Sequence, residues 1–465
     1  MEIVIGILLL ISFFGLAWYC IKGHNLMIGF LLISVIWAAL SLGGTALVSS
    51  AFIEANPILG FMTDENRTLV TVLNGIFQAA PEGWGTTLVN VLWGAWFGRV
   101  LMETGIASTI IRKTVELGGD RPLITIVLLN IVVSIIFTAM TGAGPVIAIG
   151  VIVLPILMSL GIPKGIAMFT FMGAVASGIY INPINFEQYR MMIVGMPVAD
   201  FPEFTLQFWA MQWGLWAMII NVVVTTALTA FFLHRNKTRS AWAAQTGRAP
   251  EQKNAPWYTL FLPIIPVVLN IWLNFSVIAG FIIAGFLALF LTKTLQGNFR
   301  EKCQQVNKMY FDGVVDTAPL IGFLLSLPMF NAVAAFAAPY FGSVIGPIMP
   351  TSEIVIIVAF AIVLGLGLFR GPMTLVGSGA ATLGVLRGVG SFSVPFTYAV
   401  FVIPTITVNI GSCITQSWVA WGLSYTKVES REFLKLSIPN AYVAGILIYI
   451  MTIFTVTGMG ASWFL

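Results

Sequence analysis

The amino-acid sequence predicts an all-α polytopic membrane protein built from two inverted repeats, and three observations support this prediction. Hydrophobic residues make up 58% of the 465 residues and charged residues only 9%, whereas about 25% of an ordinary soluble domain is charged. Apolar runs close to the roughly 20 residues that cross a bilayer recur from one end of the chain to the other. A short residue pattern also occurs once in each half. The runs are continuously apolar and do not alternate, which disfavours a transmembrane β-barrel.

The apolar runs define the expected helices in chain order. They are Ile3–Cys20, Leu26–Val48, Thr87–Gly105, Leu123–Met140, Gly144–Leu160, Ile166–Ile181, Phe208–Leu233, Tyr258–Leu273, Val277–Leu291, Val314–Ala337, Ile354–Phe369, Pro372–Leu386, Pro395–Ile410 and Ile438–Thr457. Several are shorter than a full span, so we expect about 10–12 spans, with the other runs forming re-entrant hairpin arms or halves of broken helices. The first run follows only Glu2, without a basic segment, and we interpret it as a retained helix rather than a signal peptide. The shorter segments Thr68–Ala80 and Val198–Phe204 are expected at the outer membrane interface.

The repeated pattern is a Gly-Pro pair followed by an asparagine. Gly144-Pro145 precedes Asn182 and Gly371-Pro372 precedes Asn409, in both cases with the asparagine 37 residues after the proline. The two copies are 227 residues apart, close to half of the chain. Each Gly-Pro pair separates two apolar runs, which predicts a re-entrant hairpin, and each asparagine ends a run that polar residues interrupt. Interrupted apolar segments at corresponding places of two halves are typical of a secondary transporter's binding site.

The distribution of Lys and Arg predicts the topology, because these residues collect on the cytoplasmic side of a membrane protein. An alternation of spans with both termini outside places most of the 22 Lys and Arg residues on the cytoplasmic side of a bacterial inner membrane. The hairpin Leu123–Leu160 then enters from the inside and the hairpin Ile354–Leu386 from the outside, so the halves form an inverted repeat. We assign residues 1–233 to the first half, the charged stretch 234–256 to a cytoplasmic linker and residues 257–465 to the second half.

The two Gly-Pro breaks are the first candidate substrate-binding elements. Non-helical backbone inside a membrane is tolerated only where protein buries it or where it lines a wet cavity. Free amides at the start of the following helix attract an anion. We select Thr141, Gly142 and Gly144 in the first break and Gly371 and Thr374 in the second. The alternative is a plain kink that binds no ligand.

Arg370, in the second break, is the strongest single candidate for contact with a substrate. A charged side chain between apolar runs is costly unless it faces a cavity or a partner. Its guanidinium matches a carboxylate with two parallel hydrogen bonds. The alternative is a structural arginine that pairs with Asp312, Asp316 or backbone carbonyls.

Polar side chains on the broken segments form a further set of candidates. Neutral amides, hydroxyls and freed carbonyls suit a hydrated organic anion or a sodium ion, and the alternative is interhelical hydrogen bonding, which Ser, Thr and Asn commonly provide in membranes. The substrate-binding candidates are Asn182, Asn409 and Ser412, and the ion-coupling candidates are Ser177 and Thr405.

Charged residues in or near the apolar runs offer a second coupling route. Asp312 and Asp316 are four residues apart and share a helix face. A protonatable carboxylate at membrane depth can couple proton movement to transport. We therefore take Asp316 as an ion-coupling candidate, with an interfacial acidic pair as the alternative. The other polar groups receive structural interpretations: Arg99 with Glu103 as an ion pair on one helix, Glu187 with Arg190 at the outer mouth, and His24 with His234 at the interface.

Two stretches of the chain resemble the gluconate:proton symporter family. These are Gly85–Ala107, with its Gly-Thr-Thr-Leu start and glycine-rich helix, and the residues that follow Arg370. That family belongs to the ion transporter superfamily, whose citrate, dicarboxylate and lactate carriers have paired hairpins and an inverted repeat. The resemblance implies proton coupling and a homodimer. The chain departs from the family at Asn182–Gln188, where the symporters have a motif with proline and histidine, and this departure favours a carboxylate other than a sugar acid.

These observations favour a secondary active transporter that moves a small organic anion by alternating access, coupled to a proton or sodium gradient. The expected partners are the anion and the lipid bilayer, with no nucleic acid, and no cofactor is expected besides the coupling ion. A sodium/proton antiporter is the alternative, although Arg370 suits an anion and repels a bare cation. The three cysteines and two histidines show no metal-ligand spacing, which disfavours a membrane-embedded enzyme. The sequence shows no selectivity-filter motif, which disfavours a channel. The identity of the anion and the choice between symport and exchange stay open at this point.

Overall fold

The computed structural model describes residues 1–22, 24–62, 68–119, 121–194, 204–235, 254–273, 275–348, 350, 352–389 and 392–457. In these ranges the chain forms α-, 3-10 and π-helices joined by short connections, and no strand occurs among them. The predicted all-α architecture is therefore confirmed. Most of the predicted linker, residues 236–253, and most of the segment Val198–Phe204 lie outside the described residues.

Each apolar run of the first half contains a helix, and further helices lie between the runs. In chain order, the helices are α1 (Glu2–Ile21), α2 (Leu26–Gly44), α3 (Ser50–Ala55), η1 (Pro57–Met62), α4 (Leu69–Asn74), η2 (Gly75–Ala79), α5 (Ala80–Glu82), α6 (Gly85–Glu103), α7 (Ile106–Gly118), α8 (Pro122–Phe137), α9 (Ala143–Ser159), α10 (Lys164–Ile179), α11 (Pro183–Val194), α12 (Leu206–Trp209), η4 (Ala210–Gly214) and α13 (Leu215–Arg235). The short segment between α8 and α9 is the predicted first hairpin tip. The first broken helix is formed by α10 and α11, which bend by 66° at their junction.

The helices of the second half include the longest one of the described chain. They are η5 (Trp257–Thr259), η6 (Leu262–Ile264), α14 (Ile265–Leu273), α15 (Val277–Leu291), α16 (Phe299–Ile345), η7 (Gly346–Ile348), α17 (Glu353–Ile362), η8 (Leu364–Arg370), α18 (Gly379–Val389), α19 (Val394–Ile403), η9 (Pro404–Ile410), α20 (Ser417–Thr426) and α21 (Ser430–Thr455). The predicted run Val314–Ala337 is only part of α16, which has 47 residues. A capping box explains its early start, because Asn298 and Glu301 satisfy each other's backbone N–H groups.

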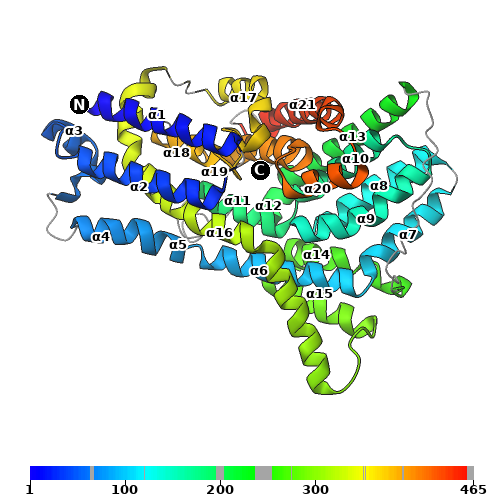
Figure 1. Ribbon diagram of the computed structural model, residues 1–465. Helices are drawn as coiled ribbons and strands as arrows, with labels where there is room; N and C mark the ends of the chain where they lie inside the picture. The colour runs from blue at the N-terminus through cyan, green and yellow to red at the C-terminus, as the bar shows by residue number, and fades with distance from the viewer. Residues whose placement is uncertain are drawn as a thin grey trace.

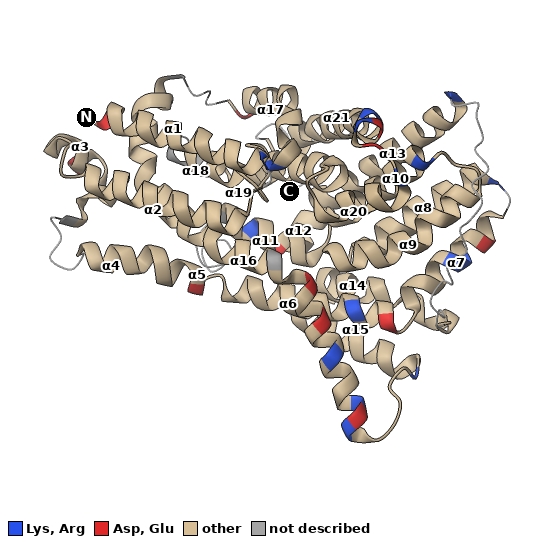
Figure 2. Cartoon of the chain, viewed as in Figure 1, with Lys and Arg blue, Asp and Glu red and all other residues tan. Residues whose placement is uncertain are grey.

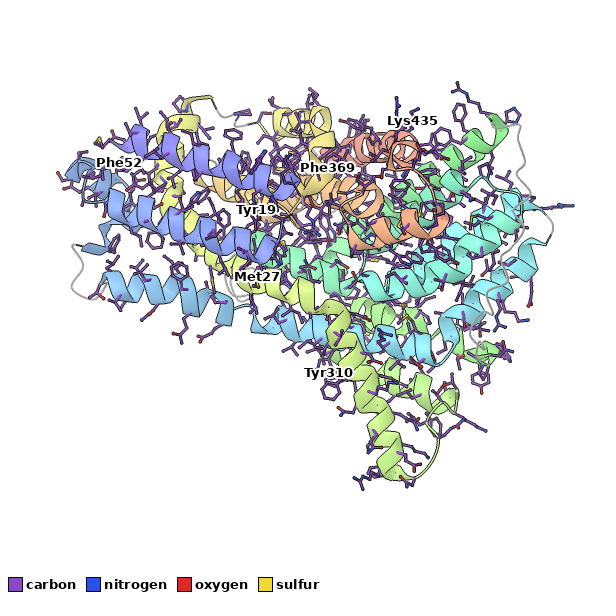
Figure 3. All side chains as sticks on the ribbon, viewed as in Figure 1. Tyr19, Met27, Phe52, Tyr310, Phe369 and Lys435 are labelled. Atoms are coloured by element: carbon purple, nitrogen blue, oxygen red, sulfur yellow. The ribbon has the colours of Figure 1, made fainter. Side chains whose placement is uncertain are left out.

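Two groups of helices can be distinguished by their contacts (Figure 1). In the first, here called the α16 group, α16 packs against α1, α2, α6 and α18. In the second, the α10 group, α10 packs against α8, α13 and α21. Each group combines helices from both halves of the sequence. The N-terminal part of α16, where Figure 3 labels Tyr310, projects from the rest of the molecule.

The helices have the length and composition of membrane spans. Five helices of the described chain are long and apolar enough to cross a membrane alone, and seven spans result if each of two bent helix pairs counts as one. Five shorter apolar segments of 10–17 residues accompany them, among them α8, α9 and α15. The protein is thus a multi-pass membrane protein. A total of about 10–12 spans requires the shorter helices to contribute and stays a prediction.

Charged residues are distributed unevenly over the described chain. Figure 2 shows many of them on the projecting part of α16 and around the ends of α7 and α13. By contrast, α2, α8 and α9 contain no Lys, Arg, Asp or Glu at all. A charge that remains among such apolar helices needs a cavity or a partner, which draws attention to the few charges in the interior.

Candidate functional site

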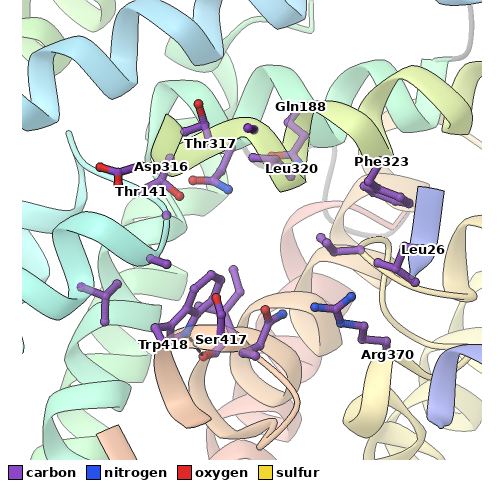
Figure 4. A pocket seen from close by; sticks show the side chains of 18 of the residues that line it. Leu26, Thr141, Gln188, Asp316, Thr317, Leu320, Phe323, Arg370, Ser417 and Trp418 are labelled. Carbon is purple, nitrogen blue, oxygen red and sulfur yellow. Dashed lines mark hydrogen bonds between the residues drawn. The ribbon is translucent and has the colours of Figure 1, made fainter. Parts of the chain in front are cut away.

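A cavity of about 400 Å³ lies where the two helix groups meet. The α16 group lines it with the start of α2 and with six residues of α16, among them Asp316, Leu320 and Phe323. The α10 group lines it with α10 and with the segment from η9 to α20, which packs against α10. Helix α11, which packs against α6 and α19, also lines it. Both hairpin tips reach the same cavity: Thr141, Gly142 and Ala143 from the first, and Arg370 and Val376 from the second (Figure 4). Its volume is that of a small-molecule site.

The first tip is held by the broken helix beside it. Gly142 has φ +96° and ψ 172°, a conformation open essentially only to glycine. The amide nitrogen of Asn182 donates to the carbonyl oxygens of Phe137 (2.9 Å) and Met140 (3.1 Å). The amide oxygen of Asn182 accepts bonds of 2.9 and 3.2 Å from two N–H groups at the start of α11. Asn182 therefore joins the end of α8 to the beginning of α11.

The second tip has a strained backbone that orients a charged side chain. Phe369 (φ +54°) and Arg370 (φ +58°) both have left-handed backbone, which is uncommon outside glycine and costs conformational energy. The Cys413 sulfur accepts a 3.1 Å hydrogen bond from the Phe369 N–H. The carbonyl oxygen of Arg370 accepts a 3.0 Å bond from the Ser378 N–H. These contacts keep the strained turn in place and so fix the direction of Arg370. The segment η8 also packs against α1.

The contact between asparagine and hairpin tip recurs in the second half. The Asn409 amide nitrogen, within the π-helix η9, donates a 3.4 Å bond to the carbonyl oxygen of Gly367. Gly367 follows Met140 by 227 residues, and Asn409 follows Asn182 by the same distance. The repeated sequence pattern is thus accompanied by a repeated hydrogen bond.

The first tip packs against a partly buried ion pair between α6 and α16. Arg99 donates from Nε to Oδ2 of Asp316 (2.7 Å) and from Nη2 to Oδ1 (2.8 Å). The predicted pairing of Arg99 with Glu103 is wrong, because two parallel bonds to a carboxylate on the neighbouring helix are stronger than a pair along one helix. A Cβ atom added to Gly144 would lie 2.3 Å from Asp316 Oδ2. The glycine of the Gly-Pro pair therefore allows the tip to approach this carboxylate.

Arg370 is the cavity's uncompensated charge. Asp316 is occupied by Arg99, and Arg370 forms no ion pair with any carboxylate in the described part of the chain. Its Nε is buried and has no hydrogen-bond partner there. Figure 4 shows the guanidinium pointing into the cavity from the side opposite Asp316 and Thr141. A guanidinium in this position can bind an anion that enters the cavity.

The other predicted substrate-binding residues fall into two sets. Thr141 and Gly142 line the cavity, and Gly144 lies directly behind them against Asp316. The rest are buried beside the tips and do not line it: Gly371, Thr374, Asn182, Asn409 and Ser412. Ser412 donates 3.3 Å bonds to two carbonyl oxygens, whereas the Thr374 hydroxyl is buried without a partner among the described residues.

Two of the three ion-coupling candidates form internal hydrogen bonds only. The Ser177 hydroxyl donates to the Gly173 carbonyl (2.8 Å) and accepts from Asn221 (2.8 Å), which joins α10 to α13. The Thr405 hydroxyl accepts from the Leu375 N–H (3.0 Å) and so supports the second tip. Asp316 is the candidate that lines the cavity.

The sequence analysis did not identify several of the residues that line the cavity. Asn185, Gln188 and Tyr189 line it from α11. Their spacing of i, i+3 and i+4 places them on one helix face, and this signal was available directly after the predicted break at Asn182. Gln416, Ser417 and Trp418 line it from the start of α20, and His24 and Asn25 from the start of α2. His24, expected at the membrane interface, is thus part of the cavity wall.

Glu187 and Arg190, which the sequence analysis places at the outer mouth, have buried or nearly buried side chains. Their side chains are only 16% and 6% exposed, and Arg190 Nη1 lies 3.2 Å from Glu187 Oε1. Because the two residues are three apart on α11, they neutralise each other on the helix itself and can be buried together. Sequence reasoning missed this because neither residue belongs to an apolar run.

Comparisons with known proteins identify similar folds but no sequence family. No protein-family model matches the chain, and no curated protein matches it. The structure of the YdaH transporter of Alcanivorax borkumensis has a TM-score of 0.55 at 14% identity, covering 90% of this chain and 97% of that one. The structure of MtrF of Neisseria gonorrhoeae, a protein of a class of antimetabolite efflux pumps, has a TM-score of 0.53 at 12% identity. The match covers 92% of this chain and 95% of MtrF. The chain shares the fold of these membrane transporters. At such identities the likeness concerns the fold alone.

Proposed function

We propose that this protein is a secondary active transporter that carries a small organic anion with a carboxylate group across the bacterial inner membrane. The observation that supports this proposal best is Arg370, a partly buried side chain without a counter-charge among the described residues, placed in a small-molecule cavity where both hairpin tips meet. The resemblance to gluconate:proton symporters favours proton coupling. The likeness to MtrF, an efflux pump by its description, makes export as reasonable a direction as uptake.

The arrangement of the cavity suggests how such transport proceeds. The cavity walls come from the α16 group on one side and the α10 group on the other. A movement of one group against the other would open the cavity to the two sides of the membrane in turn. An anion bound to Arg370 would neutralise its charge. Because an uncompensated charge is costly away from water, the loaded carrier would change conformation more readily than the empty one.

A sodium/proton antiporter without an organic substrate fits the site less well. The carboxylate of Asp316 is already neutralised by two bonds from Arg99. The remaining charge, on Arg370, repels a bare cation. Sodium therefore enters this proposal only as an alternative to the proton as coupling ion.

Thermal stability of the purified full-length protein tests the proposal. A ligand that binds only the folded state raises the apparent melting temperature by mass action. We expect at least one small carboxylate, from a panel measured with and without sodium, to raise it. Arg370→Ala should abolish the shift, since hydrogen bonds to a charged group contribute about 1.5–3 kcal/mol each. Arg431→Ala, which changes an exposed arginine at the start of α21, is the matched control and should keep the shift.

Two results would count against the proposal. If no carboxylate raises the melting temperature while sodium alone does, the antiporter becomes the better explanation. If a carboxylate shift survives in Arg370→Ala, an anion is bound but Arg370 is not its anchor.

A further inference from the structure

We propose that Asn185 and Gln188 form a second subsite, which binds a neutral hydrogen-bond donor of the anion far from its carboxylate. The inference deepens the proposed function and rests on it. It predicts that the substrate is a carboxylate with a remote hydroxyl or amide N–H group, rather than a plain fatty acid or a compound with a second charged group.

The two side chains are buried in the cavity wall with acceptors that have no partner. Asn185 is 5% exposed and Gln188 1% exposed, and both line the cavity. Oδ1 of Asn185 and Oε1 of Gln188 are buried and accept no hydrogen bond from the described residues. The Asn185 amide nitrogen donates to the Tyr189 hydroxyl at 3.3 Å, so the oxygen is the part of this amide that lacks a partner.

The position of these residues is fixed by the break in the helix. The Asn182 side chain accepts hydrogen bonds from two N–H groups at the start of α11. It donates to the Phe137 carbonyl oxygen and so connects α11 to the first tip. The face of α11 with Asn185, Gln188 and Tyr189 is therefore held toward the cavity. Because the last torsion of an amide side chain has a broad energy minimum, a small rotation brings either oxygen to a donor in the cavity.

Two unpartnered acceptors need an explanation, because almost all buried polar groups are hydrogen-bonded. Each unpartnered acceptor costs about 1–3 kcal/mol. A structural role would be served equally well by apolar side chains of similar volume. A ligand with an O–H or N–H group would remove this cost. Sites that are built to hydrogen-bond a substrate strongly reject analogues that lack the group.

The charges of the cavity decide which donor fits. Asp316 is neutralised by Arg99, and Arg370 carries a positive charge without a counterpart among the described residues. Once the carboxylate of the anion has neutralised Arg370, a sodium ion or an ammonium group would give the site a net positive charge again, so a neutral donor is favoured. Figure 4 shows Gln188 and Arg370 on opposite sides of the cavity. The carboxylate and the donor must therefore lie at opposite ends of the substrate.

A matched ligand series tests the inference on the full-length protein. Binding of hexanoate, 6-hydroxyhexanoate and 6-aminohexanoate, with the four- and five-carbon homologues, is measured through the melting temperature. We expect the hydroxyl compound of the best length to bind at least tenfold more tightly than its unsubstituted counterpart, which corresponds to about 1.4 kcal/mol. The ammonium compound should bind no better than the unsubstituted one.

Gln188→Met separates recognition from a structural role. Methionine has a similar length without a polar acceptor, so the variant should melt at a higher temperature than the natural protein when no ligand is present. Its preference for the hydroxyl compound should fall below twofold. Gln78→Met, on an exposed helix position, is the control and should change neither property.

The contradicting outcomes are distinct. Equal binding of hydroxylated and unsubstituted carboxylates, with both lost in Arg370→Ala, overturns the second subsite and leaves the transporter proposal intact. A melting temperature of ligand-free Gln188→Met below that of the natural protein assigns Gln188 a structural role and overturns the inference. Stabilisation by sodium that disappears in Gln188→Met identifies an ion site instead. No Arg370-dependent binding of any carboxylate overturns this inference together with the proposed function.

Discussion

The two hairpin tips share one sequence pattern and differ in what they present to the cavity. The first tip carries no charged residue and approaches an ion pair that is already complete, so that Gly144 lies against Asp316. The second tip has Arg370 one residue before its Gly-Pro pair, with a side chain that lacks a counter-charge among the described residues. What the halves share is the hydrogen bond from an asparagine to the tip. The repeat therefore preserves the scaffold, whereas the chemistry has diverged between the halves.

The largest effect on stability is expected from breaking the ion pair at the first tip. Removing one partner of a buried ion pair costs about 3–5 kcal/mol because a charge stays buried without compensation. The side chains of Arg99 and Asp316 are 26% and 17% exposed, so we expect about 3 kcal/mol for Arg99→Met, seen as a lower melting temperature. The double variant Arg99→Met/Asp316→Leu removes both charges and should regain most of the loss. A double variant as unstable as the single one would show that the pair is not the cause.

A smaller effect separates the two asparagines. Asn182 makes four hydrogen bonds and is completely buried. Asn409 makes one long bond to its tip and accepts one from Gln416. We expect Asn182→Ala to lower the free energy of unfolding by about 2 kcal/mol, and Asn409→Ala by about half as much. The comparison is made by thermal melting of both variants without ligand. Equal losses would mean that the hairpin tips depend on their asparagines to the same degree.

How far the sequence predicts this structure depends on the range of the interactions involved. The apolar runs predict the positions of most helices, and the Gly-Pro pairs predict both tips. Both predictions succeed because these residues act on the backbone conformation of their own segment. Arg370 was found because a charge among apolar residues is conspicuous in the sequence itself.

The sequence does not reveal which residues of distant segments pair with each other. Arg99 selects Asp316, 217 residues away, over the nearby Glu103, and only the packing of α6 on α16 brings those two side chains together. The same limit applies to α11, whose amides Asn185 and Gln188 look like ordinary polar residues until the fold turns them toward the cavity. Burial of Glu187 with Arg190 is a third example, since a mutually neutralised pair has no signature in hydropathy.

An effect as small as that of Asn409→Ala is expected from the backbone of the first tip. Gly142 has φ +96° and ψ 172°, a region that residues with a Cβ atom adopt only with backbone strain. A Cβ atom there would meet no atom within 4 Å, so the cost of Gly142→Ala, about 1 kcal/mol, arises from the backbone alone. Gly85→Ala is the matched control, because its Cβ is also free of contacts, its backbone is helical and alanine favours a helix. At the second tip, Phe369 stands 227 residues after Gly142 and tolerates a side chain because its φ of +54° and ψ of 32° lie in the left-handed helical region. A loss of melting temperature in Gly142→Ala but not in Gly85→Ala would establish that the two tips, although they share a pattern, reach the cavity through different backbone conformations. Equal melting temperatures would contradict that difference.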